Sequence, residues 1–369
     1  MSYITAIGTA NPVHRFRQST IAEFMLRAMK LNNGDGRKLQ TIFKASGIEY
    51  RHSVLEDYGR TQDFTFFAET PDLSPFPSTE NRLSVFRRNA LGLSVDSVRN
   101  LMQAYPSHKM ESVTHLVVVC CTGMYAPGLD IDLVKQLGLA TTVQRTAINF
   151  MGCYAAFNAL KIADAFCKSD THAKVLIVCT ELCSLHFQRQ GTEDNLLANA
   201  LFADGSAAVF VESESESPLK LKLKSFHNDL SPEGEQDMAW TVGDLGFEMK
   251  LSAYVPEIIR SGIAALTDSL LGKISKKLSD IHHFAIHPGG KKILEVIERE
   301  LGISREQNQS AYHVLQQYGN MSSPTVLFVL KEVVTSLSGK NEGENILSFA
   351  FGPGLTLESM VLQVERAHA

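Results

Sequence analysis

A cysteine, a histidine and an asparagine in this sequence stand in settings that suit covalent chemistry. Cys153, His287 and Asn320 each lie close to glycine, in the segments Gly-Cys, His-Pro-Gly-Gly and Gly-Asn. Glycine lets the backbone approach a ligand closely. A cysteine can attack a carbonyl, a histidine can exchange its proton, and an asparagine amide can donate to a developing oxyanion. If one fold brings the three together, they predict an acyl-transfer site.

Cys153 is predicted to stand at the start of a helix. Residues 147–151 form an apolar run that Gly152 breaks, and apolar residues recur with a helical period over 155–166. The positive end of the helix macrodipole and the unpaired N–H groups there favour a thiolate. Packing in the core is the simpler interpretation for the cysteine and the histidine, and an N-cap is the simpler one for Asn320.

The composition is that of a soluble globular protein, with 369 residues of which 44% are hydrophobic and 20% charged. The net charge of −5 is spread along the chain, which argues against a nucleic-acid surface. The N-terminus does not resemble a signal peptide, and no apolar run approaches the roughly 18 residues of a membrane helix. We therefore expect a cytoplasmic protein that binds neither nucleic acid nor membrane. The spacing of the six cysteines indicates neither a metal site nor a disulfide framework.

Apolar runs alternate with helical patterns along the chain, which indicates an α/β fold. The run at 115–123 ends in glycine and has the continuous apolar character of a parallel strand buried on both faces. Residues 173–180 repeat that pattern. Helical periodicity is found at 19–31, 37–51, 81–105 and 291–301.

The chain divides into two halves near residue 217. Residues 212–218 are polar and low in complexity, as expected for a linker. We therefore assign 1–217 to an N-terminal half that carries the cysteine, and 218–369 to a C-terminal half that carries the histidine and the asparagine. Two similar halves packed face to face would bring their loops together at one central site.

The second half echoes the first, which suggests duplication. The apolar strand at 279–290 leads into a helix, as the strand at 115–123 does. The hairpin predicted at 345–364 parallels residues 201–212, where an Asp-Gly pair is interpreted as a turn between strands. Strict alternation at 219–224 predicts a half-exposed edge strand.

Six short motifs occur in order over nearly the whole chain. They are Ala6-Ile-Gly-Thr-Ala-Asn-Pro12, Gly152-Cys153, Leu201-Phe-Ala-Asp-Gly205, Ile286-His-Pro-Gly-Gly290, Gly319-Asn-Met-Ser-Ser323 and Phe351-Gly-Pro-Gly-Leu-Thr356. Together they resemble the motifs of the type III polyketide synthases, the chalcone synthase-like enzymes. The resemblance implies an α/β, thiolase-like fold, in which two similar βαβαβαββ-type halves form a five-layer α-β-α-β-α core. It also implies a homodimer that uses malonyl-CoA and an acyl-CoA starter, with no cofactor and no acyl carrier protein.

The resemblance also implies a role for each candidate catalytic residue. Cys153, as a thiolate paired with imidazolium His287, would attack the starter thioester and hold the acyl chain. His287 and the amide of Asn320 would then donate to the enolate formed when malonyl-CoA loses CO₂. Attack of this carbanion on the acyl group extends the chain by two carbons, and cyclisation of the polyketide follows.

The same resemblance identifies a substrate pocket. Phe202 matches the aromatic gatekeeper beside the cysteine, and Phe247 is assigned to the second gatekeeper. The pocket positions, several of which depart from the plant pattern, read Cys121, Cys183, His186 and Ser322. A histidine there adds bulk and a titratable donor, which argues against a hydroxycinnamoyl starter, and we expect an aliphatic acyl-CoA or malonyl-CoA instead.

Basic residues offer candidate contacts for the phosphates of CoA. Lys38 and Lys44 lie on the helical stretch at 37–51, and Lys291 follows Gly289 and Gly290 at a predicted helix start. A solvated helix face is the alternative interpretation for these lysines.

Two other functions fit parts of the pattern. A β-ketoacyl-ACP synthase III-like condensing enzyme also uses a cysteine, a histidine and an asparagine, but its glycine-rich C-terminal loop usually lacks the proline found here at Pro353. A non-catalytic binding subunit is the second alternative, and it has no need to retain all three catalytic residues. The starter, the number of extensions and the mode of ring closure depend on cavity volume and on individual hydroxyl groups.

Overall fold

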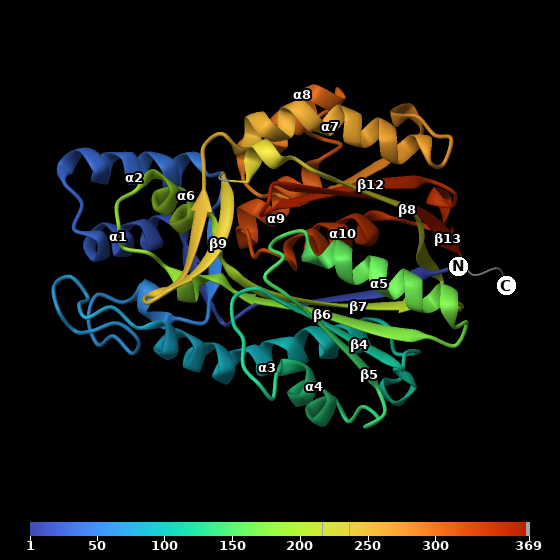
Figure 1. Ribbon diagram of the computed structural model, residues 1–369, viewed down its shortest axis with the longest axis horizontal. Helices are drawn as coiled ribbons and strands as arrows, with labels where there is room; N and C mark the ends of the chain where they lie inside the picture. Colours follow the sequence, from blue (N-terminus) through green and yellow to red (C-terminus); the bar gives the residue numbers. More distant parts are fainter. Residues whose placement is uncertain (216, 236, 367–369) are drawn as a thin grey trace.

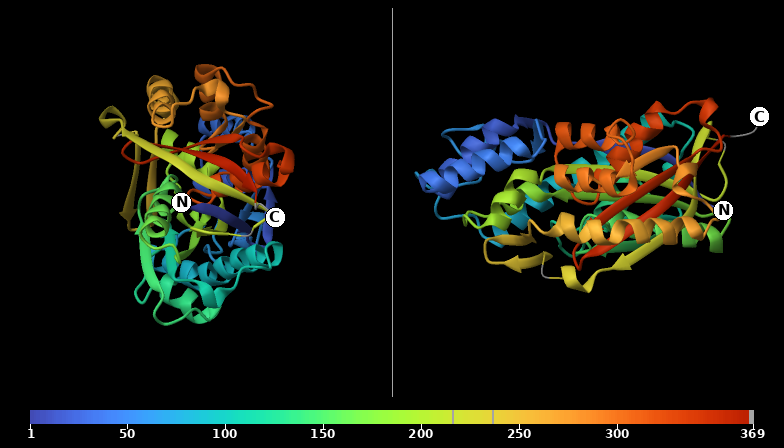
Figure 2. Two further views of the ribbon diagram at one scale, coloured as in Figure 1. Left: turned by 90° about the vertical axis from the view of Figure 1, so that its right-hand side faces the viewer. Right: turned by 90° about the horizontal axis from the view of Figure 1, so that it is seen from above.

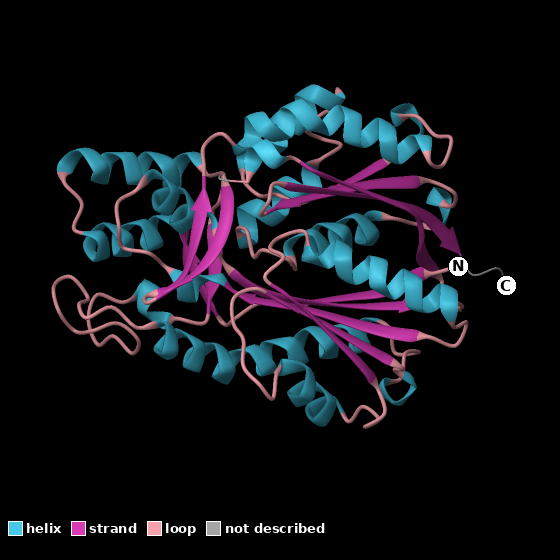
Figure 3. Cartoon of the chain, in the orientation of Figure 1, coloured by secondary structure: helices cyan, strands magenta, loops and turns pink. Residues whose placement is uncertain are grey.

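Nine strands form the framework that carries the site. The computed structural model describes residues 1–215, 217–235 and 237–366. The strands of the framework are β1 (Tyr3–Ala10), β4 (His115–Cys120), β5 (Gln144–Asn149), β6 (Lys174–Leu182), β7 (Asp204–Glu212), β8 (Leu219–Leu230), β11 (His283–Ile286), β12 (Asn345–Gly352) and β13 (Thr356–Arg366). Their hydrogen-bonded order is β11-β12-β13-β8-β1-β7-β6-β4-β5. Only the pairs Tyr3–Lys222 and Ile4–Leu221 join β1 to β8, so the nine strands fold into the two packed sheets seen in Figure 3.

Helices cover both sheets and fill the space between them. Their bounds are α1 (Gln18–Met29), α2 (Asn33–Ala45), α3 (Thr79–Ala104), α4 (Leu129–Leu137), α5 (Ala155–Ser169), α6 (Glu193–Leu201), α7 (Val255–Gly272), α8 (Lys291–Leu301), α9 (Gln309–Tyr318) and α10 (Thr325–Ser336). In Figure 1, α7 and α8 lie outside one sheet, α3 and α4 lie outside the other, and α5 and α10 lie between the two. This is the five-layer α-β-α-β-α order that the family resemblance implies.

The central helix α5 fits between two sheets because its side chains are small. Ala155, Ala156, Ala159 and Ala163 are completely buried. Such residues allow close approach of neighbouring backbones, so α5 packs against β4 and β6 on one side and β13 on the other. The start of α5, and with it the preceding turn, is therefore held in the middle of the molecule.

The buried strands follow the predicted pattern. β4 pairs in parallel with both β5 and β6, and every residue of β4 is buried. The hairpin predicted at 345–364 is also confirmed, because β12 and β13 pair antiparallel over eight residue pairs.

Three local predictions are wrong. The helix predicted at 37–51 ends at Ala45, and Tyr50–Ser53 is a strand, because its residues pair with His14–Arg17. No hairpin turn separates strands at 201–212, because Leu201 ends α6 and Asp204–Glu212 is the single strand β7. The segment at 219–224 is not at an edge, because β8 pairs with β13 along its length and with β1 at its start. The division of the chain near residue 217 stays a prediction, and residues 216 and 367–369 lie outside the described residues.

A smaller lobe lies at one end of the sheets, away from the N-terminus (Figure 2). It contains α1, α2, α6 and two short antiparallel pairs. β2 (His14–Arg17) pairs with β3 (Tyr50–Ser53), and β9 (Met238–Gly243) pairs with β10 (Gly246–Leu251). The junction of this lobe with the five layers is where the predicted site residues gather.

Candidate active site

Three loops bring the predicted catalytic residues together. Cys153 lies in the turn between β5 and α5, His287 follows β11, and Asn320 lies between α9 and α10. The Sγ atom of Cys153 is 4.0 Å from Oδ1 of Asn320. The Asn320 amide donates to the carbonyl of Gly289, two residues beyond His287, at 3.3 Å. The loops of both halves thus meet at one point, as the sequence predicts for an acyl-transfer site.

The backbone around Cys153 depends on glycine. Gly152 has a φ of +81°, and a Cβ atom there would lie 2.4 Å from Cδ of Pro353. Two residues other than glycine near the site also have positive φ, Phe150 and Ser322, both at 59°. Such conformations cost free energy and concentrate at functional sites.

The backbone of His287 is fixed by a hydrogen bond, whereas its ring nitrogens have no hydrogen-bond partner in the described part of the chain. Its N–H donates to the carbonyl of Phe349 at 2.8 Å, which extends the parallel pairing of β11 with β12. The side chain is buried, and neither ring nitrogen has a hydrogen-bond partner among the described residues. Burial lowers the pKa of His287 to about 3, so the imidazole is neutral at physiological pH.

Burial disfavours the thiolate form of Cys153. Burial raises its pKa to about 12, although the side-chain contacts with Ser322 and Asn320 act in the opposite direction. A rise from 9 to 12 corresponds to about 4 kcal/mol, whereas a helix macrodipole contributes at most about 2 kcal/mol. Desolvation therefore outweighs the helix start. Burial disfavours both the thiolate of Cys153 and an imidazolium at His287, and the expected ion pair between them stays a prediction.

A buried carboxylate beside the cysteine was not foreseen from the sequence. Glu181 accepts hydrogen bonds from the N–H of Cys121 at 2.9 Å, from the Thr122 hydroxyl at 2.8 Å and from the Ser323 hydroxyl at 2.7 Å. Burial raises its pKa to about 7, and its charge acts to raise the pKa of Cys153. A charged residue inside the apolar run of β6 is the signal that could have identified it.

His186 occupies a fixed place in the predicted pocket. Its Nδ1 accepts the N–H of Phe247 at 2.9 Å, so the ring proton is on Nε2, which donates to the Thr122 carbonyl at 2.7 Å. The ring stacks on Phe247 with a centroid distance of 4.3 Å and lies edge-on to Trp240 at 5.8 Å. Burial lowers the pKa of His186 to about 3, so this histidine is a neutral wall residue.

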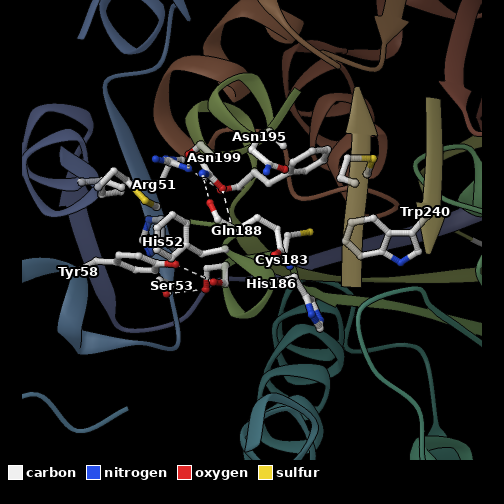
Figure 4. Close-up of a pocket in the computed structure, with 17 residues that line it drawn as sticks. Arg51, His52, Ser53, Tyr58, Cys183, His186, Gln188, Asn195, Asn199 and Trp240 are labelled. Atoms are coloured by element: carbon white, nitrogen blue, oxygen red, sulfur yellow. Dashed lines mark hydrogen bonds between the residues drawn. The ribbon is translucent and has the colours of Figure 1, made fainter. Parts of the chain in front are cut away.

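A cavity opens beside these residues (Figure 4). Phe202, Cys183 and His186 line it, as predicted, and Phe202 forms a parallel β-bridge with Asn320. The lining also includes Trp240 and Met249, which the sequence analysis missed.

Met249 could have been found from the alternation of β10, which places it two residues beyond Phe247 on the same face of the strand. Phe247 itself is 1% exposed and stacks against His186, outside the lining. Its gatekeeper role stays a prediction. The two remaining predicted pocket residues lie against the catalytic turn: Cys121 Sγ accepts the N–H of Gly152 at 3.1 Å, and the Ser322 N–H donates to Asn320 Oδ1 at 2.8 Å.

The candidate CoA contacts lie in separate places. Gly289, Gly290 and Lys291 line a pocket of about 240 Å³ with otherwise mostly apolar walls. Lys44 lines a different groove, between α1 and α2, and Lys38 forms a surface ion pair with Glu193 at 3.2 Å. The structure thus groups Lys291 with the glycines close to Asn320, and it does not bring Lys38 or Lys44 to the same pocket.

Across 1–215, 217–235 and 237–366, no three or more histidine, cysteine or acidic side chains are arranged to hold a metal ion. Within these ranges, no helix has both the length and the apolar character needed to cross a bilayer.

Comparisons with known proteins agree with this geometry. Residues 1–215 match the family model for the N-terminal domain of chalcone and stilbene synthases, and residues 222–365 match that for the C-terminal domain. The chain is 31% identical over 370 residues to the alpha-pyrone synthesis polyketide synthase-like Pks18 of Mycobacterium tuberculosis, covering 99% of this chain and 92% of that relative.

Two solved structures share the whole fold. The C-terminal type III polyketide synthase domain of Steely1, a type I/III hybrid from Dictyostelium, superposes with a TM-score of 0.89 at 29% identity, covering 100% of this chain and 99% of that one. PKS-I from the brown alga Ectocarpus siliculosus gives a TM-score of 0.91 at 29% identity, covering 98% of both chains. The thiolase-like fold is therefore confirmed, and the chain belongs to the chalcone and stilbene synthase family, the type III polyketide synthases.

Proposed function

We propose that this enzyme loads an acyl-CoA starter onto Cys153, extends it with malonyl-CoA units and releases the product by cyclisation. The observation that carries the proposal is the meeting of Cys153, Asn320 and the His287 loop at one buried point. The family uses malonyl-CoA and acyl-CoA substrates, and no cofactor is needed in the steps below. The alternative of a β-ketoacyl-ACP synthase III-like enzyme is not favoured by the comparisons.

Loading begins with a thiol rather than a thiolate. Neutral His287, whose ring nitrogens have no other partner among the described residues, accepts the proton of Cys153 as the sulfur attacks the starter carbonyl. The carbonyl–sulfur bond to CoA then breaks, and the departing CoA takes the proton from His287. This order removes the need for a resting ion pair in a buried site.

Decarboxylation requires donors aimed at the thioester oxygen of malonyl-CoA. The Asn320 amide is oriented at both ends, because its Oδ1 accepts the Ser322 N–H and its Nδ2 donates to the Gly289 carbonyl. The second N–H of Nδ2 and the ring of His287 can then stabilise the enolate as CO₂ leaves. The carbanion attacks the acyl carbon on Cys153, a C–C bond forms and the C–S bond breaks. The lengthened chain returns from CoA to Cys153 for the next extension.

CoA entry is assigned to the pocket of Gly289, Gly290 and Lys291. Apolar walls suit the pantetheine arm, and the Lys291 ammonium suits a phosphate. Lys38 and Lys44 stay candidates for phosphate contacts outside that pocket.

We also propose a homodimer that acts in the cytoplasm. β5 is an edge strand with mostly exposed side chains, and Met124 and Met151 are exposed just beyond the adjacent ends of β4 and β5. A cluster of exposed large apolar side chains beside a free strand edge favours association with a second copy.

The proposal is tested by mass spectrometry of products from malonyl-CoA with acetyl-, medium-chain, long-chain and aromatic acyl-CoA starters. Products that differ by the starter and share a fixed number of two-carbon additions are expected. Cys153→Ala should fold and give none of these products. Polyketide formation by Cys153→Ala would refute the mechanism, and turnover only with malonyl-acyl carrier protein would support the ketosynthase alternative.

A further inference from the structure

Arg51 in β3 is a buried cation near the catalytic residues, and no step described so far involves it. Its side chain is 4% exposed. Its Nε donates to Oε1 of Gln18 at 2.8 Å, and its Nη1 donates to the carbonyls of Asn199 at 2.8 Å and Phe202 at 2.7 Å. Nη2 has no hydrogen-bond partner in the described part of the chain. Figure 4 shows Arg51 beside Asn199, at the opposite end of the cavity from Trp240.

The stem of Arg51 packs against the residue before Asn320. A Cβ atom built on Gly319 would lie 3.0 Å from Cγ of Arg51 and 3.1 Å from its Cδ. Gly319 also has a φ of +69°, so no other residue fits this position without strain. Arg51 therefore touches the asparagine loop with its methylenes and the Phe202 segment with its guanidinium.

These two segments are joined to each other by backbone hydrogen bonds. The Asn320 N–H donates to the Leu201 carbonyl at 2.9 Å, and the Ala203 N–H donates to the Asn320 carbonyl at 2.8 Å. Arg51 thus braces both sides of a short parallel bridge whose two central residues are Phe202 and Asn320. One of these faces the cavity, and the other contacts the Cys153 sulfur.

The chemistry of this brace is particular to arginine. Burial lowers the pKa of Arg51 to about 10, so it remains charged at neutral pH despite desolvation. A planar guanidinium carries five N–H donors in a fixed arrangement, whereas a lysine ammonium is a point donor on a flexible stem. Lysine would keep the charge but could not hold the Gln18 oxygen and both carbonyls with the same geometry.

We propose that Arg51 is a positioning residue that holds Phe202 and Asn320 in register, so that decarboxylation of malonyl-CoA depends on its hydrogen bonds to the backbone and on its packing against Gly319. The proposal rests on the role assigned to Asn320 above. Acylation of Cys153 forms no malonyl enolate, so it does not need the Asn320 amide as an enolate donor. A change at Arg51 should therefore slow decarboxylation more than it slows acylation.

The test compares wild type with Arg51→Lys in the full-length enzyme. Decarboxylation is followed as acetyl-CoA formed from malonyl-CoA, and loading is followed by intact-mass detection of acetylated Cys153 after mixing with acetyl-CoA. We expect decarboxylation to fall at least about tenfold, because a displacement of about 1 Å can cost about 100-fold in rate, while loading changes little. Equal loss of both reactions, or loss of neither, would overturn the proposal.

Arg82→Lys is the matched control. Arg82 is fully buried, also has an unpaired Nη2 among the described residues, and donates to the carbonyls of Pro77, Leu185 and Phe187 rather than to the Phe202–Asn320 bridge. The Arg82→Lys variant should have a lower melting temperature than the wild type but the same ratio of decarboxylation rate to loading rate. The same change of ratio in Arg82→Lys would show that the effect is general loss of stability, and would overturn the proposal.

Two further variants keep the test decisive. Gln18→Leu removes the acceptor for Arg51 Nε, together with the Gln18 amide's own bonds to the Ser46 hydroxyl and the Ala200 carbonyl, and it leaves both carbonyl contacts of Arg51. It should therefore shift the ratio of decarboxylation to loading in the same direction by less, even if Arg51→Lys does not fold. An unchanged ratio in Gln18→Leu would count against the brace. Asn320→Ala, measured alongside, should abolish decarboxylation; if it does not, the assignment of Asn320 fails, and that failure is distinct from a failure at Arg51.

Discussion

Replacing His287 by glutamine should change how the stability of the enzyme depends on pH. The imidazole is buried, makes no hydrogen bond within the described residues, and has its pKa lowered by burial from 6.5 to about 3. Its contribution to stability is therefore complete above pH 6.5 and is lost as the pH falls from 6.5 towards 3. In that range the unfolded chain binds a proton at His287 and the folded chain does not.

The size of the effect follows from proton linkage. One proton bound only by the unfolded state lowers the free energy of unfolding by about 1.4 kcal/mol for each pH unit. Between pH 6.5 and pH 4 the loss from His287 is therefore about 3 kcal/mol, a large part of the stability of an ordinary domain. His287→Gln removes this loss and breaks no hydrogen bond of the ring.

The assay is urea unfolding at fixed protein concentration at pH 7.5, 6, 5 and 4. The free energy of unfolding of His287→Gln minus that of the wild type should rise by about 3 kcal/mol between pH 7.5 and pH 4. His172→Gln is the matched control, because that side chain is exposed in the folded protein and its environment changes little on unfolding. A difference for His287→Gln that is independent of pH would refute the inference that this imidazole is neutral and buried.

Two further substitutions test the walls of the site. Gly152→Ala places a methyl group 2.4 Å from Pro353 Cδ at a φ of +81°, so it should destabilise the protein by about 1–3 kcal/mol and abolish loading of Cys153 even where the variant folds, as measured by thermal unfolding and intact-mass analysis. Trp240→Phe removes the hydrogen bond from Nε1 to the Cys121 carbonyl at 2.9 Å and shortens one cavity wall. It should cost about 1 kcal/mol and raise kcat/KM for longer acyl-CoA starters relative to acetyl-CoA, and an unchanged starter profile would show that Trp240 does not limit the chain.

The sequence was sufficient for features that depend on local pattern. Continuous apolar runs identified β4 and β6, and glycine punctuation placed Cys153 at a strand–helix turn. The order of the six motifs along the chain indicated the family resemblance, and through it the fold and the roles of His287 and Asn320. Each motif is a short local pattern, so it can be recognised without knowledge of the tertiary structure.

Features that depend on tertiary packing could not be predicted in this way. The protonation of Cys153 depends on how completely other segments bury it, and no local pattern reports that. Met249 and Trp240 reach the cavity only because the β9–β10 pair lies beside it. The place of β8 between two strands depends on partners at opposite ends of the chain, so its alternation, typical of an edge, was misleading.

Trp240 is the one tryptophan among the 369 residues, and it stands edge-on to neutral His186 in the wall of the cavity. The indole emission of this enzyme therefore comes from a single site in the cavity wall. We expect an acyl chain that enters this cavity to change the polarity around the indole. Rapid-mixing fluorescence of the unlabelled enzyme would then report when the cavity is filled.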